Sequence, residues 1–210
     1  CVGGGFVYGS LGMSHHATED IAIMRALPDV TVVAPGDLVE AACATKAIYE
    51  TPGTCYLRLG RGGEKQIHES IDNFQIGKAI KIQDGENIAI FSTGAIFDEV
   101  DEACKVLSEE GIIPTVYTFP TVKPIDKDVI LQCAEKYDTI ITVEEHNLSG
   151  GFGSAVAEVL SEQSDVKAKL VRVALDDRYS CIVGSQKYLR QQYSIDSKAI
   201  IEKVKENYTK

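Results

Sequence analysis

Residues 9–28, GSLGMSHHATEDIAIMRALP, form a glycine-punctuated loop that leads directly into an amphipathic helix. Two adjacent histidines, His15 and His16, lie where the loop meets the helix, and the chain has 4 histidines in all. Loops at such places often hold substrate-handling residues in α/β folds, although neighbouring loop histidines can equally be exposed without a role. Adjacent positions are poorly spaced for joint metal ligation and no third ligand lies nearby, so we predict no metal site.

The helix after this loop has its own reasons to form. Ile21, Met24 and Leu27 repeat at helical spacing and are expected to face a core. Either Thr18 or Ser14 is placed to cap its first turn. A helix packed in this way would be rigid and would hold the two histidines at its N-terminal end.

Composition indicates an ordinary globular protein of 210 residues, with 44% hydrophobic and 25% charged residues. The formal net charge of −10 argues against nucleic acid or an anionic membrane as a partner. No apolar run approaches the roughly 20 residues that a membrane-spanning helix needs. The 6 cysteines include no Cys-x-x-Cys pair, which favours reduced thiols and a cytoplasmic location.

The first part of the chain alternates strand and helix, with strands expected at 31–34 and 54–59 and a helix at 37–49. The second strand runs into Gly60-Arg61-Gly62-Gly63, so Arg61 lies just past its carboxyl end, where open α/β sheets bind ligands. Arginine suits phosphate because its planar fork donates two hydrogen bonds at once, although a solvated turn arginine fits the sequence as well. Arg58 is the weaker second candidate, because alternation along the strand could point it elsewhere.

A polar stretch at 67–75 is typical of a linker, in which we expect His68 to be exposed, and a second α/β unit follows from residue 76. Asp84-Gly85 is typical of a hairpin turn between two strands. Further along, strands alternate with helices, which favours a largely parallel sheet covered by helices. The expected strands are 76–82, 87–91, 113–119, 139–144 and 170–175, a turn is bracketed by Pro120 and Pro124, and the expected helices are 97–109, 127–136, 150–161, 188–193 and 197–207.

Three further motifs leave alternatives open. The segments 92–94 (STG) and 150–154 (GGFGS) each open a helix, but neither is a GxGxxG or P-loop motif, so close packing is favoured over nucleotide binding. Glu144-Glu145-His146 is either an acid/base cluster or a structural group. The glycine run at 3–5 suits either a tight turn or a close approach to a ligand.

The ordered motifs of residues 1–66 resemble the transketolase signature in the pyrimidine-binding domain of thiamine-diphosphate enzymes. Ser14-His15-His16 stands for the family's Thr-His-Gln type tripeptide, and 25–28 and 35–37 match the helix end and the turn that follow. The resemblance continues through 122–126, 143–154 and 184–190. It implies an α/β fold made of the end of a pyrimidine-binding domain (1–66), a linker (67–75) and a Rossmann-like transketolase C-terminal domain (76–210).

The same resemblance implies transfer of a two-carbon ketol unit between sugar phosphates, with thiamine diphosphate and Mg as cofactors. His15 would be the catalytic residue, as a proton donor and acceptor or as an oxyanion stabiliser. His16, which stands where glutamine is usual, and Arg61 or Arg58 would bind substrate. Leu11 and Gly3 stand where an acidic residue and a histidine are usual, so the substrate is expected to differ from a typical ketose phosphate.

The chain lacks the Gly-Asp-Gly motif that holds the diphosphate and its metal in this family, and the activating glutamate would precede residue 1. No cofactor-binding residue of this chain is therefore predicted. We expect the C-terminal section or subunit of a larger enzyme, inactive without an N-terminal transketolase section and assembled as a homodimer. The alternatives are a deoxyxylulose-phosphate synthase, the β subunit of a 2-oxoacid dehydrogenase, or a non-catalytic dimerisation module.

Overall fold

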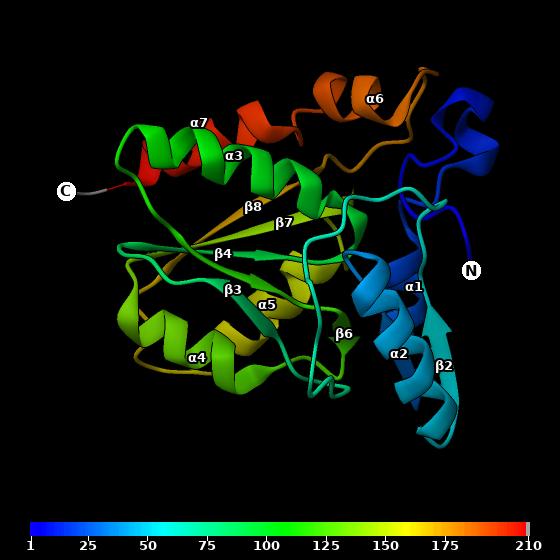
Figure 1. Cartoon of the computed structure of the whole chain (residues 1–210), viewed down its shortest axis with the longest axis horizontal. Coiled ribbons are helices and arrows are strands. Elements are labelled where there is room, and N and C mark those ends of the chain that lie inside the picture. The colour runs from blue at the N-terminus through cyan, green and yellow to red at the C-terminus, as the bar shows by residue number, and fades with distance from the viewer. Residues whose placement is uncertain (209–210) are drawn as a thin grey trace.

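The computed structural model describes residues 1–208, which form two β-sheets that lie side by side and are covered by helices (Figure 1). The strands are β1 (Val30–Val33), β2 (Thr54–Leu57), β3 (Ile80–Gln83), β4 (Ile88–Ser92), β5 (Thr115–Thr118), β6 (Thr121–Lys123), β7 (Thr139–Asn147) and β8 (Lys169–Leu175). The larger sheet has the strand order β3-β5-β4-β7-β8, and the smaller one has the order β2-β1-β6.

The larger sheet confirms the predicted mainly parallel α/β architecture of the second unit. Strands β5, β4, β7 and β8 run parallel, and only the edge strand β3 is antiparallel to its neighbour. The predicted hairpin at Asp84-Gly85 is wrong, because β5 lies between β3 and β4. The N–H of Gly85 donates to the Thr115 hydroxyl at 2.8 Å, so the connection crosses the end of β5 instead of folding back on β3.

Helices cover both faces of the larger sheet (Figure 1). The helical segments are η1 (Gly9–Leu11), η2 (Met13–His15), α1 (Asp20–Ala26), α2 (Leu38–Glu50), η3 (Gly94–Ile96), α3 (Phe97–Glu109), α4 (Lys127–Lys136), α5 (Phe152–Ser161), α6 (Gln186–Gln192) and α7 (Ser197–Asn207). One face of the sheet carries α3, α6 and α7, and the other carries α4 and α5.

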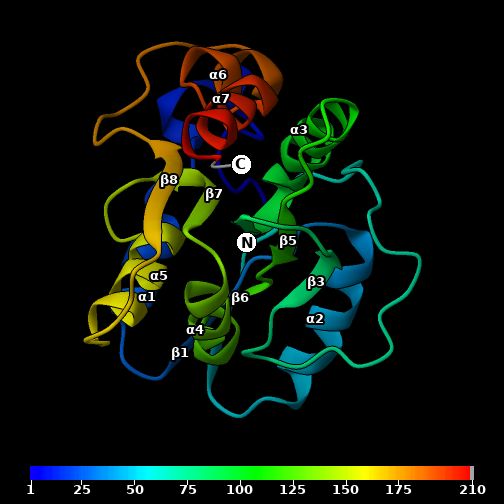
Figure 2. The ribbon, with the colours of Figure 1, turned by 90° about the vertical axis from the view of Figure 1, so that its left-hand side faces the viewer.

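The smaller sheet is built from both parts of the chain. Strands β1 and β2 are parallel and come from residues 1–66, whereas β6 comes from the second unit and pairs antiparallel with β1. Residues 121–123, expected within a turn between two prolines, are therefore a strand. Figure 2 shows α1 and α2 on either side of this sheet.

Two hydrophobic cores lie on opposite faces of the larger sheet, because alternate residues of a strand point to opposite sides. Phe6 joins the core under α3, α6 and α7. Ile21 and Val32 join the core under α4 and α5, together with Phe91 and Phe152. The first part of the chain therefore packs into both cores of the second unit.

Local capping signals are only partly reproduced. Asp126 caps α4, and Gly111 ends α3 with a positive φ, both as the sequence predicts. The predicted cap of α1 is wrong, because the Thr18 hydroxyl donates to the Glu19 carboxylate and no side chain caps the helix. Leu27 is also not a core residue, since it is 44% exposed beyond the end of α1.

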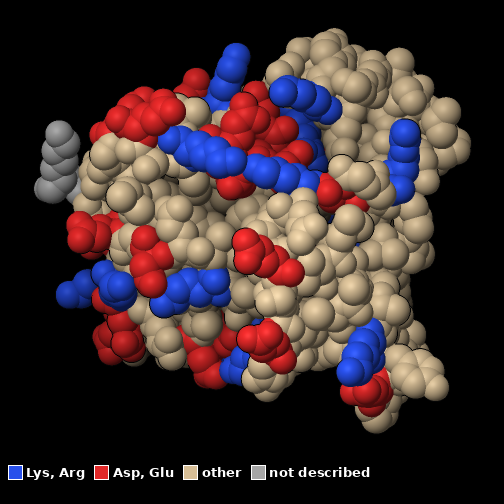
Figure 3. Space-filling model, viewed as in Figure 1, with Lys and Arg blue, Asp and Glu red and all other residues tan. Residues whose placement is uncertain are grey.

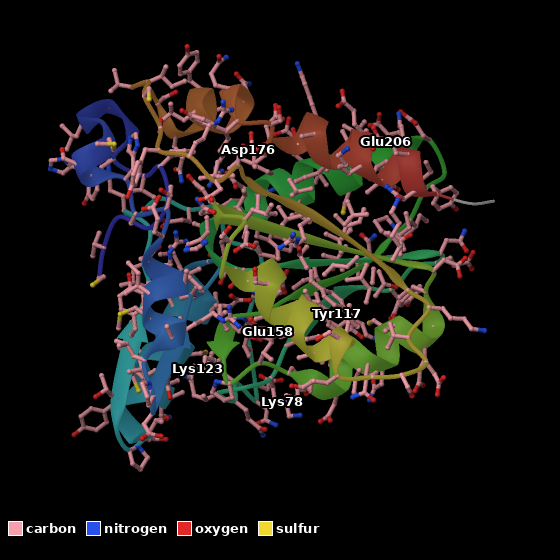
Figure 4. All side chains as sticks on the ribbon, turned by 180° about the vertical axis from the view of Figure 1, so that it is seen from behind. Lys78, Tyr117, Lys123, Glu158, Asp176 and Glu206 are labelled. Atoms are coloured by element: carbon pink, nitrogen blue, oxygen red, sulfur yellow. The ribbon has the colours of Figure 1, made fainter. Side chains whose placement is uncertain are left out.

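The C-terminal end of α1 is instead held by the second unit. Figure 4 shows Lys123 and Glu158 on this side of the molecule. The Lys123 ammonium donates to the carbonyl oxygens of Arg25 and Leu27, and the Arg25 guanidinium pairs with Glu158 at 2.6 Å. The Lys123 contacts thus supply a partner to carbonyl groups at the end of a helix that has only 7 residues.

The stretch from 60 to 79 forms neither helix nor strand, in keeping with a linker, but His68 within it is not exposed. Its side chain is 9% exposed, and its Nδ1 lies 3.2 Å from Oδ2 of Asp37, which caps α2. The same oxygen accepts the backbone N–H groups of Ile67 and His68. No local pattern indicates this contact, because the linker is anchored by a residue 31 positions away.

Candidate functional site

The two histidines lie in a loop of residues 6–17, which we call the histidine loop. His15 is exposed at the end of η2, and its Nδ1 lies 3.0 Å from the Ser14 hydroxyl. His16 is half-buried, with its Nε2 3.3 Å from the Gly9 carbonyl oxygen and its ring edge-on to Phe6. His15 is therefore accessible to a ligand, while His16 is also part of the packing of the loop.

The base of the histidine loop is closed by a two-way backbone pair between Gly5 and Ala17, with N···O distances of 2.7 and 3.0 Å. The preceding glycines allow large side chains to lie directly against this backbone. A Cβ atom on Gly5 would lie 2.6 Å from Glu145 Cγ, and one on Gly4 would lie 2.9 Å from Arg58 Cζ. The glycine run thus permits close packing against protein side chains.

Arg58 is buried under the loop, with 5% of its side chain exposed. Its Nε donates to Asp20 at 2.8 Å, and its Nη2 donates to the carbonyl oxygens of Ala17 and Glu145 at 2.8 and 3.0 Å. Arg58 is thus buried, occupied by protein partners and absent from the lining of the cleft that holds Arg61, which argues against its prediction as a phosphate ligand. Alternation along the strand sends it inward, where it fixes the end of the histidine loop.

Arg61 is exposed on the wall of a cleft of about 830 Å³ between the first part of the chain and the second unit. Gly9 and Ser10 of the histidine loop line the same cleft, but His15 does not. Arg61 therefore shares this cleft with the first residues of the loop and not with His15. Basic and acidic side chains intermingle over α3 beside it (Figure 3). Lys65 and Lys105 both pair with Asp101 there, whereas the described residues give the Arg61 guanidinium no partner.

Glu145 is the residue whose importance the sequence did not reveal. Strand alternation separates the cluster at 144–146, so that Glu145 points to one face of β7 and its two neighbours to the other. Its carboxylate accepts the Phe6 N–H at 2.7 Å and pairs with Arg190 at 2.7 Å. Arg190 also donates to Asp98 at 2.7 Å. The only signal in the sequence was that both residues belong to motifs that resemble one family.

Glu144 and His146 are structural on the other face. The two oxygens of Glu144 accept the N–H groups of Phe152 and Gly153 at the start of α5. His146 Nδ1 lies 2.8 Å from the Asn147 carbonyl oxygen, and its Nε2 accepts the Ala22 N–H at 3.3 Å, which assigns the neutral ring with the proton on Nδ1. Both side chains are fully buried. Of the two alternatives, an acid/base cluster and a structural group, the structure favours the structural group.

Burial shifts the pKa values of this pair in opposite directions. It raises the pKa of Glu144 to about 7, against the opposing effect of the two N–H donors. Burial, assisted by the charge of Arg58, lowers the pKa of His146 to about 4. Both groups are therefore held in their neutral forms over the weakly acidic range.

Models of two protein domain families match most of the chain. The pyrimidine binding domain of transketolase matches residues 2–64, and the C-terminal domain of transketolase matches residues 77–200. The chain belongs to the transketolase family. This confirms the resemblance that rests on the histidine loop and the motifs that follow it.

Relatives within the transketolase family differ in how their chains are divided. A protein of Methanocaldococcus jannaschii assigned as a transketolase C-terminal section is 35% identical over 208 residues, which are 98% of this chain and 64% of that protein. A 1-deoxy-D-xylulose-5-phosphate synthase of Geobacter sulfurreducens is also 35% identical, over 198 residues that cover 93% of this chain and 31% of that enzyme.

A solved structure described as a split gene transketolase, an inactive beta4 tetramer, has a TM-score of 0.85 and 30% identity. The alignment covers 99% of this chain and 64% of that one. This chain thus spans less than two thirds of the length of these relatives. Their names tie the family to transferases and to assembly with further subunits.

Among residues 1–208, no group of three or more His, Cys, Asp or Glu side chains could hold a metal ion. None of the described helices is long and apolar enough to cross a membrane. The 6 cysteines are all free thiols.

The two shifted pKa values predict opposing pH effects on stability. Between pH 4.5 and 7 the unfolded chain ionises Glu144 while the folded chain keeps its proton, so this residue makes stability fall as pH rises. Between pH 4 and 6.5 the unfolded chain protonates His146 while the folded chain does not, so this residue makes stability rise as pH rises.

The free energy of unfolding, measured with urea between pH 4.5 and 7, should therefore distinguish the contributions of the two residues. The variant Glu144→Gln lacks the group that makes the parent lose stability as pH rises. Its free energy of unfolding should therefore increase relative to that of the parent, by about 3 kcal/mol from pH 4.5 to pH 7. His146→Gln should lose stability relative to the parent as pH rises through its own window. Parallel pH profiles for all three chains would contradict the assignment of neutral forms to the folded state.

Proposed function

We propose that this chain is the C-terminal section of a thiamine-diphosphate-dependent transferase that moves a two-carbon ketol unit between sugar phosphates. The observation that carries the proposal is the histidine loop, whose accessible His15 stands at the position of the family's catalytic-loop histidine. Arg61 on the adjoining cleft adds a group suited to a phosphate. Membership of the transketolase family over nearly the whole chain supports the same reaction class.

The residues present do not fit the diphosphate and magnesium of the cofactor. The chain has no Gly-Asp-Gly motif, and its described residues offer no three-ligand cluster for a metal. We propose that an N-terminal transketolase section supplies both, so that this chain is inactive alone. In the reaction, this chain is proposed to bind the sugar phosphate and to act on it through His15.

His15 is proposed to exchange a proton with a substrate oxygen or to stabilise negative charge there. Imidazole suits this task because it both gives and takes a proton near neutral pH. His16 is proposed to make a polar contact to substrate in place of the usual glutamine. Arg61 is proposed to hold the phosphate, whose binding energy would position the reacting end of the sugar.

Exposed apolar side chains support assembly with another section and a homodimer. Val2, Leu11, Met13, Ile23 and Leu38 are each more than half exposed, and all lie in the first part of the chain. Isolated exposed apolar residues are ordinary, but this number within one short part of the chain suits a surface that another subunit covers. A cytoplasmic location is proposed from the free thiols.

One specific observation favours a second candidate function. The deoxyxylulose-phosphate synthase relative is as similar to this chain as the transketolase section is, at 35% identity for each. Assays with an aldose phosphate acceptor and either a ketose phosphate or a 2-oxoacid as donor would separate the two reactions.

The role of His15 is tested in the enzyme assembled from this chain and its N-terminal section. His15→Gln should lower kcat by about 10²- to 10⁴-fold, since it removes the group that transfers the proton. His68→Gln is the control, because it makes the same change at a histidine that is held by Asp37 outside the histidine loop, and it should keep kcat within a few-fold of the parent. Near-parental kcat in His15→Gln would remove His15 from the chemistry.

The role of Arg61 is tested by comparing substrates. Arg61→Ala should raise KM for a phosphorylated acceptor by about 10- to 100-fold, the cost of losing charge-assisted hydrogen bonds, and leave KM for the unphosphorylated sugar unchanged. Lys65→Ala, on the same cleft wall but paired with Asp101, should alter neither value appreciably. Equal effects of Arg61→Ala on both acceptors would exclude a phosphate contact.

A further inference from the structure

We infer that Glu145 is a positioning residue that holds the histidine loop at both of its ends. The C-terminal domain would then set the positions of His15 and His16 through a side chain that is itself buried. This inference rests on the proposed function of the loop. It is carried by three linked contacts: Glu145 with Phe6 at the start of the loop, Phe6 with His16 within the loop, and Glu145 with Ala17 through Arg58 at the end of the loop.

The first contact fixes the start of the loop. Glu145 is 3% exposed, and its Oε1 accepts the backbone N–H of Phe6 at 2.7 Å. Its Oε2 accepts from Arg190 Nη2 at 2.7 Å and from the Gln186 amide at 2.9 Å. Every partner of the carboxylate is a donor, so both oxygens must remain acceptors for all of these contacts to persist.

The second contact joins the ring of Phe6 to the ring of His16 within the loop. Phe6 is 1% exposed, and its ring meets the His16 ring edge-on at a centroid distance of 5.1 Å. Tyr193 stacks on the same phenyl ring at 5.3 Å. A displacement of Phe6 would therefore move His16 directly, and with it the neighbouring His15.

The third contact fixes the end of the loop. The carbonyl oxygen of Glu145 accepts from Arg58 Nη2 at 3.0 Å, and the same nitrogen donates to the Ala17 carbonyl oxygen at 2.8 Å. Because Gly5 and Ala17 also pair with each other, the side chain and the main chain of one residue hold the two ends of a closed loop. A Cβ atom on Gly5 would collide with Glu145, which shows how closely the two segments lie.

Glu145→Gln tests the inference, because it keeps the shape of the side chain but places an amide NH2 against either Phe6 N–H or Arg190. Glu144→Gln is the matched control: the same change one residue away, on the face of β7 that contacts α5 and His146. Side-chain NMR resonances of the 4 histidines in the 210-residue chain report the result without any assay of activity.

In Glu145→Gln the His16 resonances should shift while those of His68, which is held by Asp37, stay in place. In Glu144→Gln the His146 resonances should shift while those of His16 stay in place. Unchanged His16 resonances in folded Glu145→Gln would overturn the inference. If Glu145→Gln does not fold, Gln186→Ala removes only the amide contacts to the carboxylate; it should give a smaller shift of His16, and no shift would overturn the inference.

Kinetics of the assembled enzyme complete the test. Glu145→Gln should lower kcat by about 10- to 100-fold with little change in KM for the sugar phosphate, as expected when a reacting group is misplaced but the phosphate contact is kept. Glu144→Gln should keep kcat within a few-fold. A shifted His16 with unchanged kcat would support the positioning role and contradict the catalytic role of the loop. A lowered kcat with unshifted His16 would contradict the positioning role.

Discussion

The buried ion pair between Glu145 and Arg190 is the interaction on which the arrangement of this chain depends. Each side chain is 3% exposed, so each has lost its hydration and is stabilised only by the protein groups around it. Glu145 receives donors from the N-terminal segment and from α6, and Arg190 is also bound by Asp98 and Glu99. Such a network is favourable only when every member is paired, so it requires all of these segments to be in place together.

A second buried pair acts from the first part of the chain. Burial by itself would raise the pKa of Asp20, but the charge and hydrogen bond of Arg58, with help from Tyr56, hold it below its usual value. Asp20 therefore stays ionised and keeps Arg58 in reach of the Ala17 and Glu145 carbonyl groups. The first part of the chain is thus joined to β7 through two charged contacts as well as through both hydrophobic cores.

The sequence predicted those features that depend on neighbouring residues. The bounds of α3 and α4 followed from their periodicity and from Gly111 and Asp126, which act within one turn of each helix. The short strand β6, the insertion of β5 beside β3 and the burial of His68 depend on partners far along the chain, and local patterns contain no information about them. For the same reason Arg61 could be placed beside a strand end from sequence, whereas the inward contacts of Arg58 and the role of Glu145 could not.

This chain is proposed to carry the substrate-side groups of an enzyme whose cofactor site lies in another section. Calorimetric titration of thiamine diphosphate with Mg tests this division most directly. We predict no binding to the 210-residue chain alone and clear binding once the N-terminal transketolase section is present. Micromolar binding to this chain alone would contradict the division, because a complete cofactor site would then lie within these residues.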